Sequence, residues 1–230
     1  MNLCIIPARG GSKRIPKKNI KYFCGKPIII WSIQRAKESK CFDKIIVSTD
    51  SLKIAKLAVS YGAEVPFLRS RKLSDDYTST VSVISDAINR EINKFKKPKY
   101  VCCIYATAPF INSDDLKMGL KLLKKFNPTY TFPATNYAHP IQRSFKINKN
   151  KKLKMFYPRY YNYRTQDLER AFHDVGQFYW AKTETWLKKI PIINNNSIPI
   201  SIPRERAHDI DTFEDWKIAE NYFLSLNFKK

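Results

Sequence analysis

Glycine and positive charge occur together in residues 5–19, IIPARGGSKRIPKKN, directly after an apolar stretch near the start of the chain. Gly10 and Gly11 leave room for backbone N–H groups to approach a phosphate, and basic side chains supply charge-assisted hydrogen bonds. The five basic residues here are Arg9, Lys13, Arg14, Lys17 and Lys18. The loop matches neither G-x-G-x-x-G nor G-x-x-x-x-G-K-[ST], so it is a candidate phosphate site of another kind. The alternative is a tight turn whose basic side chains are solvated.

Two carboxylates stand two residues apart in HDIDT, residues 208–212. In an extended segment Asp209 and Asp211 point the same way. Hard oxygen ligands so placed suit Mg²⁺, which takes one or two carboxylates together with phosphate oxygens and water. The alternative is capping of the helix that follows, a role that Thr212 already provides.

Hydroxyls and acids gather in SDDYTST, residues 74–80, ahead of an expected helix. Their side chains either cap that helix or contact a nucleotide base or ribose. The sequence does not decide between these two roles.

Residues 141–164 carry eight lysines and arginines and no acid, with aromatic residues between them. Such a mixture can stack bases and contact phosphates of single-stranded nucleic acid. It also suits a dimer interface, or a lid over an acidic sugar, and the pattern leaves all three open.

Composition limits the class of protein. The 230 residues are 43% hydrophobic, enough for the core of one α/β domain. The net charge is +22, and residues 1–40 hold ten basic residues against one acid, which favours a polyanionic ligand. Five cysteines without a C-x-x-C pair indicate reduced thiols acting as small apolar side chains. No apolar run approaches about 20 residues, so we expect a cytoplasmic protein without membrane contact.

Strand and helix patterns alternate through the first half of the chain. Strands are expected at 3–8, 43–50, 100–110 and 130–135, and helices at 27–39, 51–62, 81–95 and 113–126. This rhythm predicts an α/β fold with a mostly parallel sheet, whose ligands bind beyond the carboxyl ends of the strands. Four loops are therefore expected to meet at one cleft: 8–14, 48–50, 105–109 and the end of 130–135. Ser51 and Ser113 are the expected caps of their helices.

The second half breaks the alternation. A hairpin and an extended aromatic stretch are expected within 137–175, then strands at 176–182 and 197–203. A final helix is expected at 213–226, where Thr212 and Asp215 approximate a capping box. We therefore expect one domain, residues 1–230, with a protruding arm at 137–175.

Several stretches together resemble a known family, and they cover essentially the whole chain in the family's order. IIPARGGSKRIPKKNIKYFCGKPII, FDKIIVSTD, YGAEVPFLR and DIDTFEDW are similar to the cytidylyltransferases that activate acidic sugars, the CMP-sialic acid synthetase family. Within it, HPIQRSFKI, YRTQDLERAFHDVGQFYW and CCIYATAPF look most like the members that use pseudaminic acid. The resemblance implies a Rossmann-like sheet of the nucleotide-diphospho-sugar transferase type, with a β-hairpin dimerisation arm.

The implied activity is transfer of CMP from CTP to the anomeric hydroxyl of a nine-carbon acidic sugar, pseudaminic acid, with release of pyrophosphate. The same chemistry on N-acetylneuraminate, legionaminate or 3-deoxy-manno-octulosonate is the alternative within this class. A single-stranded nucleic-acid-binding module is the alternative from another class. The implied homodimer, in which one subunit's arm reaches the other's site, favours interface and lid over nucleic acid.

The resemblance also implies roles for particular residues. Residues implied to bind the nucleotide are Ala8, Arg9, Gly10, Gly11, Ser12, Lys13, Lys18, Asn19, Arg69 and Ser79. Residues implied to bind the sugar are Tyr105, Gln142, Arg143, Arg164, Gln166, Asp167 and Gln177. Asp209 and Asp211 are the implied Mg²⁺ ligands.

Arg9, Lys18 and Asp211 are the candidate catalytic residues. Arg9 is expected to contact charge on the α- and β-phosphates in the transition state. No general base is evident, and deprotonation of the sugar hydroxyl with help from the metal is a hypothesis. Ala106 stands where relatives commonly carry proline, which is expected to loosen the turn at Tyr105.

Overall fold

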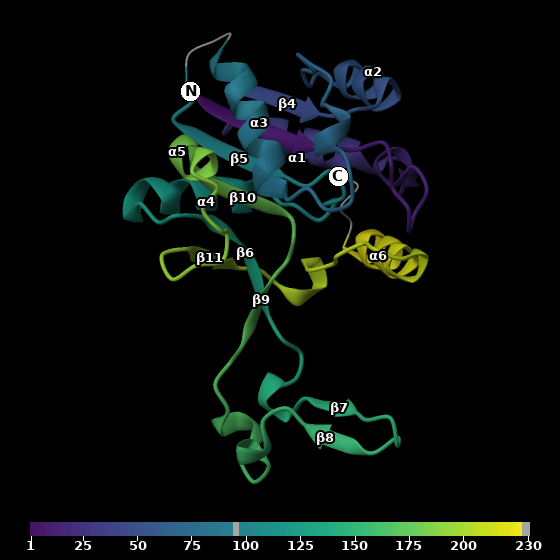
Figure 1. The fold of residues 1–230 in the computed structure, drawn as a ribbon, viewed down its shortest axis with the longest axis vertical. Helices are drawn as coiled ribbons and strands as arrows, with labels where there is room; N and C mark the ends of the chain where they lie inside the picture. Colours follow the sequence, from purple (N-terminus) through teal and green to yellow (C-terminus); the bar gives the residue numbers. More distant parts are fainter. Residues whose placement is uncertain (94–96, 227–230) are drawn as a thin grey trace.

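A computed structural model describes residues 1–93 and 97–226. Its centre is a seven-stranded sheet of order β11-β6-β10-β5-β1-β4, with β9 paired to β6 (Figure 1). The strands are β1 (Asn2–Pro7), β4 (Lys44–Ser48), β5 (Tyr100–Ile104), β6 (Thr131–Asn136), β9 (Phe172–Asp174), β10 (Phe178–Lys182) and β11 (Ile198–Ser201).

The sheet is mostly parallel, as predicted. β1 is parallel to both β4 and β5, and β11 is parallel to β6. The exception is β10, which lies antiparallel between β5 and β6, while β9 adds a short antiparallel pair to β6. The expected alternation therefore holds up to β5, and a strand from later in the chain separates β5 from β6.

Helices cover both faces of the sheet. They are α1 (Ile28–Ser39), α2 (Leu52–Ser60), α3 (Thr80–Ile92), α4 (Ser113–Phe126), α5 (Thr183–Leu187) and α6 (Phe213–Ser225). Cys4 and Ile6 of β1 pack with residues of α1, α2 and α4 on one face. Leu3 and Ile5 pack with α3 and α5 on the other face. Because successive side chains of a strand alternate in direction, an uninterrupted apolar run such as β1 is buried on both sides.

Helix caps explain several element boundaries. Ser51 caps α2 by accepting a hydrogen bond from the Ile54 N–H, and Thr212 with Asp215 forms the expected capping box of α6. The expected Ser113 cap is wrong, because Asn112 accepts from the Asp114 N–H and Ser113 is the first helical residue. Both residue types cap well, so the sequence alone places the cap one residue late, although the expected range 113–126 agrees with α4.

A third apolar cluster attaches α6 to the rest of the fold. Phe223 is fully buried, and its ring packs against Phe23, Trp31 and Phe110 at centroid distances of 5.3, 4.5 and 5.6 Å. The two-stranded ribbon of β2 (Tyr22–Phe23) and β3 (Lys26–Pro27) supplies part of this cluster. The packing fixes the segment just before α6, which carries Asp211.

The arm extends away from the sheet (Figure 1). Its hairpin pairs β7 (Phe145–Ile147) with β8 (Leu153–Met155), and most of these six residues are exposed. Cys4, Cys102 and Cys103 are buried in the sheet, which agrees with their expected role as apolar side chains. Within the described part of the chain, the helices are too short or too polar to cross a membrane.

Candidate active site

A cavity of about 300 Å³ opens at the carboxyl ends of β1 and β5. Residues of the loop 9–19, the segment 69–83 and the turn 105–107 line it, together with Asp211. The predicted contribution from the end of 130–135 is wrong. Thr135 is buried with its hydroxyl donating to the Ile202 carbonyl, and it lines a different cavity of about 480 Å³ beside Asn136. Insertion of β10 between β5 and β6 moves that strand end away from the first cavity.

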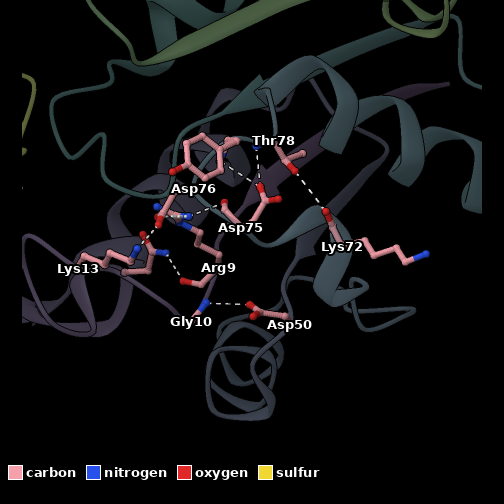
Figure 2. A network of polar contacts seen from close by, with 10 residues as sticks. Arg9, Gly10, Lys13, Asp50, Lys72, Asp75, Asp76 and Thr78 are labelled. Atoms are coloured by element: carbon pink, nitrogen blue, oxygen red, sulfur yellow. Dashed lines mark hydrogen bonds and ion pairs between the residues drawn. The ribbon is translucent and has the colours of Figure 1, made fainter.

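The glycine loop is held from both sides. The Gly10 N–H donates to Asp50 Oδ1 at 2.8 Å, and the Asn19 side-chain amide donates to the Arg9 carbonyl at 2.9 Å (Figure 2 shows the first contact). A Cβ on Gly10 would lie 3.2 Å from the Ser51 Cβ, so the close approach favours glycine, whereas Gly11 faces open space. The segment 48–50 therefore contributes to the site indirectly, because Asp50 supports the glycine loop. Ala8 is buried beneath it.

Basic side chains of this loop meet acids inside the cavity. Arg9 Nη1 lies 2.7 Å from Asp76 Oδ1 and donates to the Asp75 carbonyl at 2.5 Å. Lys13 Nζ lies 2.5 Å from Asp76 Oδ2 (Figure 2). These contacts join the loop after β1 to the segment before α3.

Asp211 forms the opposite side of the same cavity. Its carboxylate lies 2.8 Å from Arg14 Nη1 and 3.2 Å from Lys18 Nζ. The Asp211 N–H donates to Asp215 Oδ2, so the capping box that starts α6 also fixes the backbone of this acid. The predicted catalytic residues Arg9, Lys18 and Asp211 thus line one cavity, although they are up to 202 positions apart in the chain.

Asp209 and Asp211 each offer carboxylate oxygens, the type of ligand that suits a divalent cation. Partial burial and then repulsion from Asp211 raise the pKa of Asp209, even though much of its surface is exposed. A cation between them would relieve that repulsion. Among the described residues, no group of three or more His, Cys, Asp or Glu is placed to hold a metal, so the remaining ligands would be substrate oxygens and water.

The segment 69–80 both caps a helix and lines the cavity. Arg69 is 5% exposed, its Nε donates to Ser74 Oγ at 3.1 Å, and burial lowers its pKa. Ser79 caps α3 by accepting from the Ser82 N–H, and it does not line the cavity as predicted for a nucleotide ligand. Thr80, one residue on, lines it instead. The capping role left open for residues 74–80 is therefore confirmed at Ser79, while contact with a nucleotide stays a prediction.

Tyr105 lies in the wall beside Thr80, and their hydroxyls are 3.0 Å apart. Burial raises the pKa of Tyr105 to about 12, so its phenol is neutral at physiological pH. Hydrogen bonds on both sides hold the turn at Tyr105. The Tyr105 N–H donates to the Gln177 carbonyl, the Tyr105 carbonyl accepts from Ser32 Oγ, and Ala106 is buried beside them.

The structure does not bring the other predicted sugar ligands to this cavity. Five of them belong to the arm, outside the residues lining the cavity of the same chain: Gln142, Arg143, Arg164, Gln166 and Asp167. Gln177 is 1% exposed, with its Nε2 donating to the Arg206 carbonyl. Gln177 is therefore buried in this structure and does not line the cavity, and its contact with a sugar stays a prediction.

Some cavity residues were missed as individual site residues: Arg14, Asp75, Asp76, Thr78, Thr80 and Thr107. The sequence does indicate residues 74–80 as a candidate segment for base or ribose contacts. What the sequence did not indicate is that Asp76 would meet Arg9 and Lys13, because that pairing depends on how α3 packs against β1.

Residues 3–222 match the sequence profile of the family described as Cytidylyltransferase. The chain is 43% identical over 219 residues to pseudaminic acid cytidylyltransferase of Campylobacter jejuni, covering 95% of this chain and 94% of the relative. It is 32% identical to CMP-N,N'-diacetyllegionaminic acid synthase of the same species, with 97% and 95% covered. The fold is similar to that of CMP:2-keto-3-deoxy-manno-octonic acid synthetase complexed with CTP, with a TM-score of 0.72, 14% identity, and 98% and 99% of the chains covered.

Proposed function

The chain belongs to the cytidylyltransferase family, and we propose that it transfers CMP from CTP to the anomeric hydroxyl of pseudaminic acid, releasing pyrophosphate. The observation that carries this proposal is the 43% identity over nearly the full length of both chains. The cavity supports it, because its basic residues converge on the place where an α/β sheet binds its ligand.

The basic wall suits a triphosphate. Arg9, Lys13, Arg14 and Lys18 line the cavity together with Arg69, and these cations outnumber the acids of the lining, which are Asp75, Asp76 and Asp211. In-line attack at the α-phosphorus spreads negative charge over the phosphate oxygens, and pre-positioned cations stabilise that charge without reorganising. Lys18 is the most protected, at 16% side-chain exposure, and Arg9 is held by the Asp75 carbonyl. These two are best placed to act in the transition state.

Asp209 and Asp211 would hold Mg²⁺, and the bound ion would neutralise phosphate charge and orient the phosphate oxygens. Asp211 lies in the cavity wall, whereas Asp209 lies outside its lining. Lys18 and Arg14 direct the Asp211 carboxylate toward the loop through two ion pairs. Removing the Asp211 carboxylate is therefore expected to affect turnover more than removing that of Asp209.

Tyr105 is proposed to contact the sugar through a neutral hydroxyl. With a pKa of about 12 it can donate or accept a hydrogen bond, but it is a poor base at physiological pH. The Tyr105 ring also packs edge-on against Tyr179 at 5.5 Å, and the Tyr179 hydroxyl donates to Asp174 Oδ2 at 2.6 Å. This arrangement fixes the position of Tyr105.

The arm is proposed to act in a homodimer. Its exposed aromatic residues and five sugar candidates are outside the cavity of their own chain, so a second copy is needed to bring them to a site. Mixing an Arg164→Ala variant with an Arg9→Ala variant tests this. The first variant keeps an intact Arg9, and the second keeps an intact arm. In a mixed dimer that exchanges arms, the intact arm reaches the cavity with the intact Arg9, so one complete site is restored. Activity no greater than the sum of the separate variants would contradict an arm acting between subunits.

Sugar choice is tested by pyrophosphate release with CTP, Mg²⁺ and a panel of acidic sugars. Pseudaminic acid is expected to give the highest kcat/KM. The comparison sugars are N-acetylneuraminate, N,N'-diacetyllegionaminate and 3-deoxy-manno-octulosonate. Equal turnover on N-acetylneuraminate would contradict the assignment of the sugar while leaving the cytidylyltransferase chemistry in place.

A further inference from the structure

Carboxylates of the chain itself neutralise part of the basic wall of the cavity. Asp76 contacts Arg9 and Lys13, while Asp211 contacts Arg14 and Lys18. Asp211 has an expected role as a metal ligand. Asp76 has none in the family chemistry described above, although one carboxylate group of Asp76 bridges two cations expected to bind phosphate.

A turn built by the neighbouring residues presents Asp76 to those cations. Asp75 Oδ1 accepts from the Tyr77 and Thr78 N–H groups at 3.0 and 2.7 Å, and the Asp75 carbonyl accepts from Arg9. Figure 2 shows Asp75 turned back toward Thr78 and Asp76 directed toward Arg9 and Lys13. The two cations lower the pKa of Asp76, so it is charged at physiological pH.

The pairing is easily exchanged. The Asp76 side chain is 32% exposed, and those of Arg9 and Lys13 are 33% and 81% exposed. Ion pairs at such sites contribute little, because water and salt screen them. A phosphate group offers the same two cations more charge and more acceptor oxygens than a carboxylate does. The geometry therefore suits a temporary partner better than a permanent structural link.

We propose that Asp76 is an internal stand-in for a phosphate group, which holds Arg9 and Lys13 in place and competes with the phosphates of incoming and leaving ligands. This inference rests on the proposed function and adds a residue that sets affinity. An internal competitor reduces the apparent affinity of each ligand that needs the same cations by a common factor. Asp76 would thus lower the affinity for pyrophosphate after transfer and favour product release.

The test is calorimetric binding of pyrophosphate, CTP and cytidine to the full chain and to Asp76→Asn, at fixed Mg²⁺. We expect the variant to bind pyrophosphate and CTP about 2- to 5-fold more tightly, from the range typical of exposed ion pairs. Cytidine has no phosphate, so its affinity is expected to stay unchanged. Pyrophosphate should also become a stronger product inhibitor by the same factor.

Two further variants separate this role from a general change in charge. Asp76→Glu keeps the carboxylate and should bind pyrophosphate as the wild type does. Asp114→Asn makes the same change in net charge at an exposed acid paired to Lys117 on α4, and it should also behave as the wild type. Asp76 lies on an exposed turn, and Asp76→Ala provides a second variant if Asp76→Asn is poorly folded.

Unchanged or weaker pyrophosphate binding by Asp76→Asn would overturn the inference, as would equal tightening by Asp114→Asn. If the wild type binds CTP and pyrophosphate but Asp76→Asn shows no gain, only this inference fails. A wild type that binds neither ligand would contradict the proposed function and this inference with it.

Discussion

Replacing Asp211 with asparagine is the most informative change in the cavity. The amide has nearly the same shape but removes the charge that lies 2.8 Å from Arg14 and 3.2 Å from Lys18. The substitution also removes one of two carboxylates proposed to hold Mg²⁺. A metal at a transferring phosphate stabilises the transition state by several kcal/mol, and about 1.4 kcal/mol corresponds to a tenfold change in rate. We therefore expect kcat to fall by about 100- to 1,000-fold.

Stability should change far less than turnover. The Asp211 side chain is 33% exposed, and its backbone N–H still donates to Asp215 in the variant. Exposed ion pairs contribute about 0–1 kcal/mol, so a Tm shift of only a few degrees is expected. Glu214→Gln is the matched control, because Glu214 is exposed in the first turn of the same helix and outside the cavity.

The assay is pyrophosphate release at saturating CTP and sugar, repeated over a Mg²⁺ titration. We expect that high Mg²⁺ does not restore the kcat of Asp211→Asn. The kcat of Glu214→Gln should equal that of the wild type. Activity of Asp211→Asn within threefold of the wild type would refute the role of this carboxylate.

Three other substitutions test separate parts of the account. Arg9→Ala should lower kcat about 100-fold and Arg9→Lys less, and steady-state kinetics that show only a higher KM for CTP would limit Arg9 to ground-state binding. The raised pKa of Tyr105 adds stability that is present below about pH 10 and lost as pH rises through about 12. The Tm of Tyr105→Phe should therefore fall less steeply than that of the wild type over this pH range. Parallel plots of Tm against pH would contradict a buried phenol at Tyr105. Phe223→Ala should destabilise the fold by about 3–5 kcal/mol in urea unfolding, because a fully buried ring is lost, and a loss below about 1 kcal/mol would show that α6 is not held by this cluster.

Local patterns were sufficient to predict the first half of the fold. The apolar runs of β1 and β5 are buried on both faces, and such strands are recognisable without knowledge of their neighbours. Ser51 and Thr212 marked helix starts because capping is a local interaction. Residue type and spacing likewise indicate the glycine loop and the Asp209–Asp211 pair as candidate sites, because these patterns are local.

Features that depend on tertiary packing could not be predicted in this way. The strand at 176–182 was expected, but nothing local indicates that β10 enters between β5 and β6. Helix α5 has five residues and β9 has three, too few to show a clear periodicity. The contact of Asp76 with Lys13 likewise joins two segments that only the folded chain brings together.

Competition between two sugars is the most direct test of the proposal that this protein activates pseudaminic acid. The purified protein would be given CTP, Mg²⁺ and equal amounts of pseudaminic acid and N-acetylneuraminic acid, and the CMP-sugars would be identified by mass spectrometry. We expect CMP-pseudaminic acid as the main product, formed with one pyrophosphate for each CTP consumed. Equal amounts of the two CMP-sugars, or CTP consumption without any CMP-sugar, would contradict it.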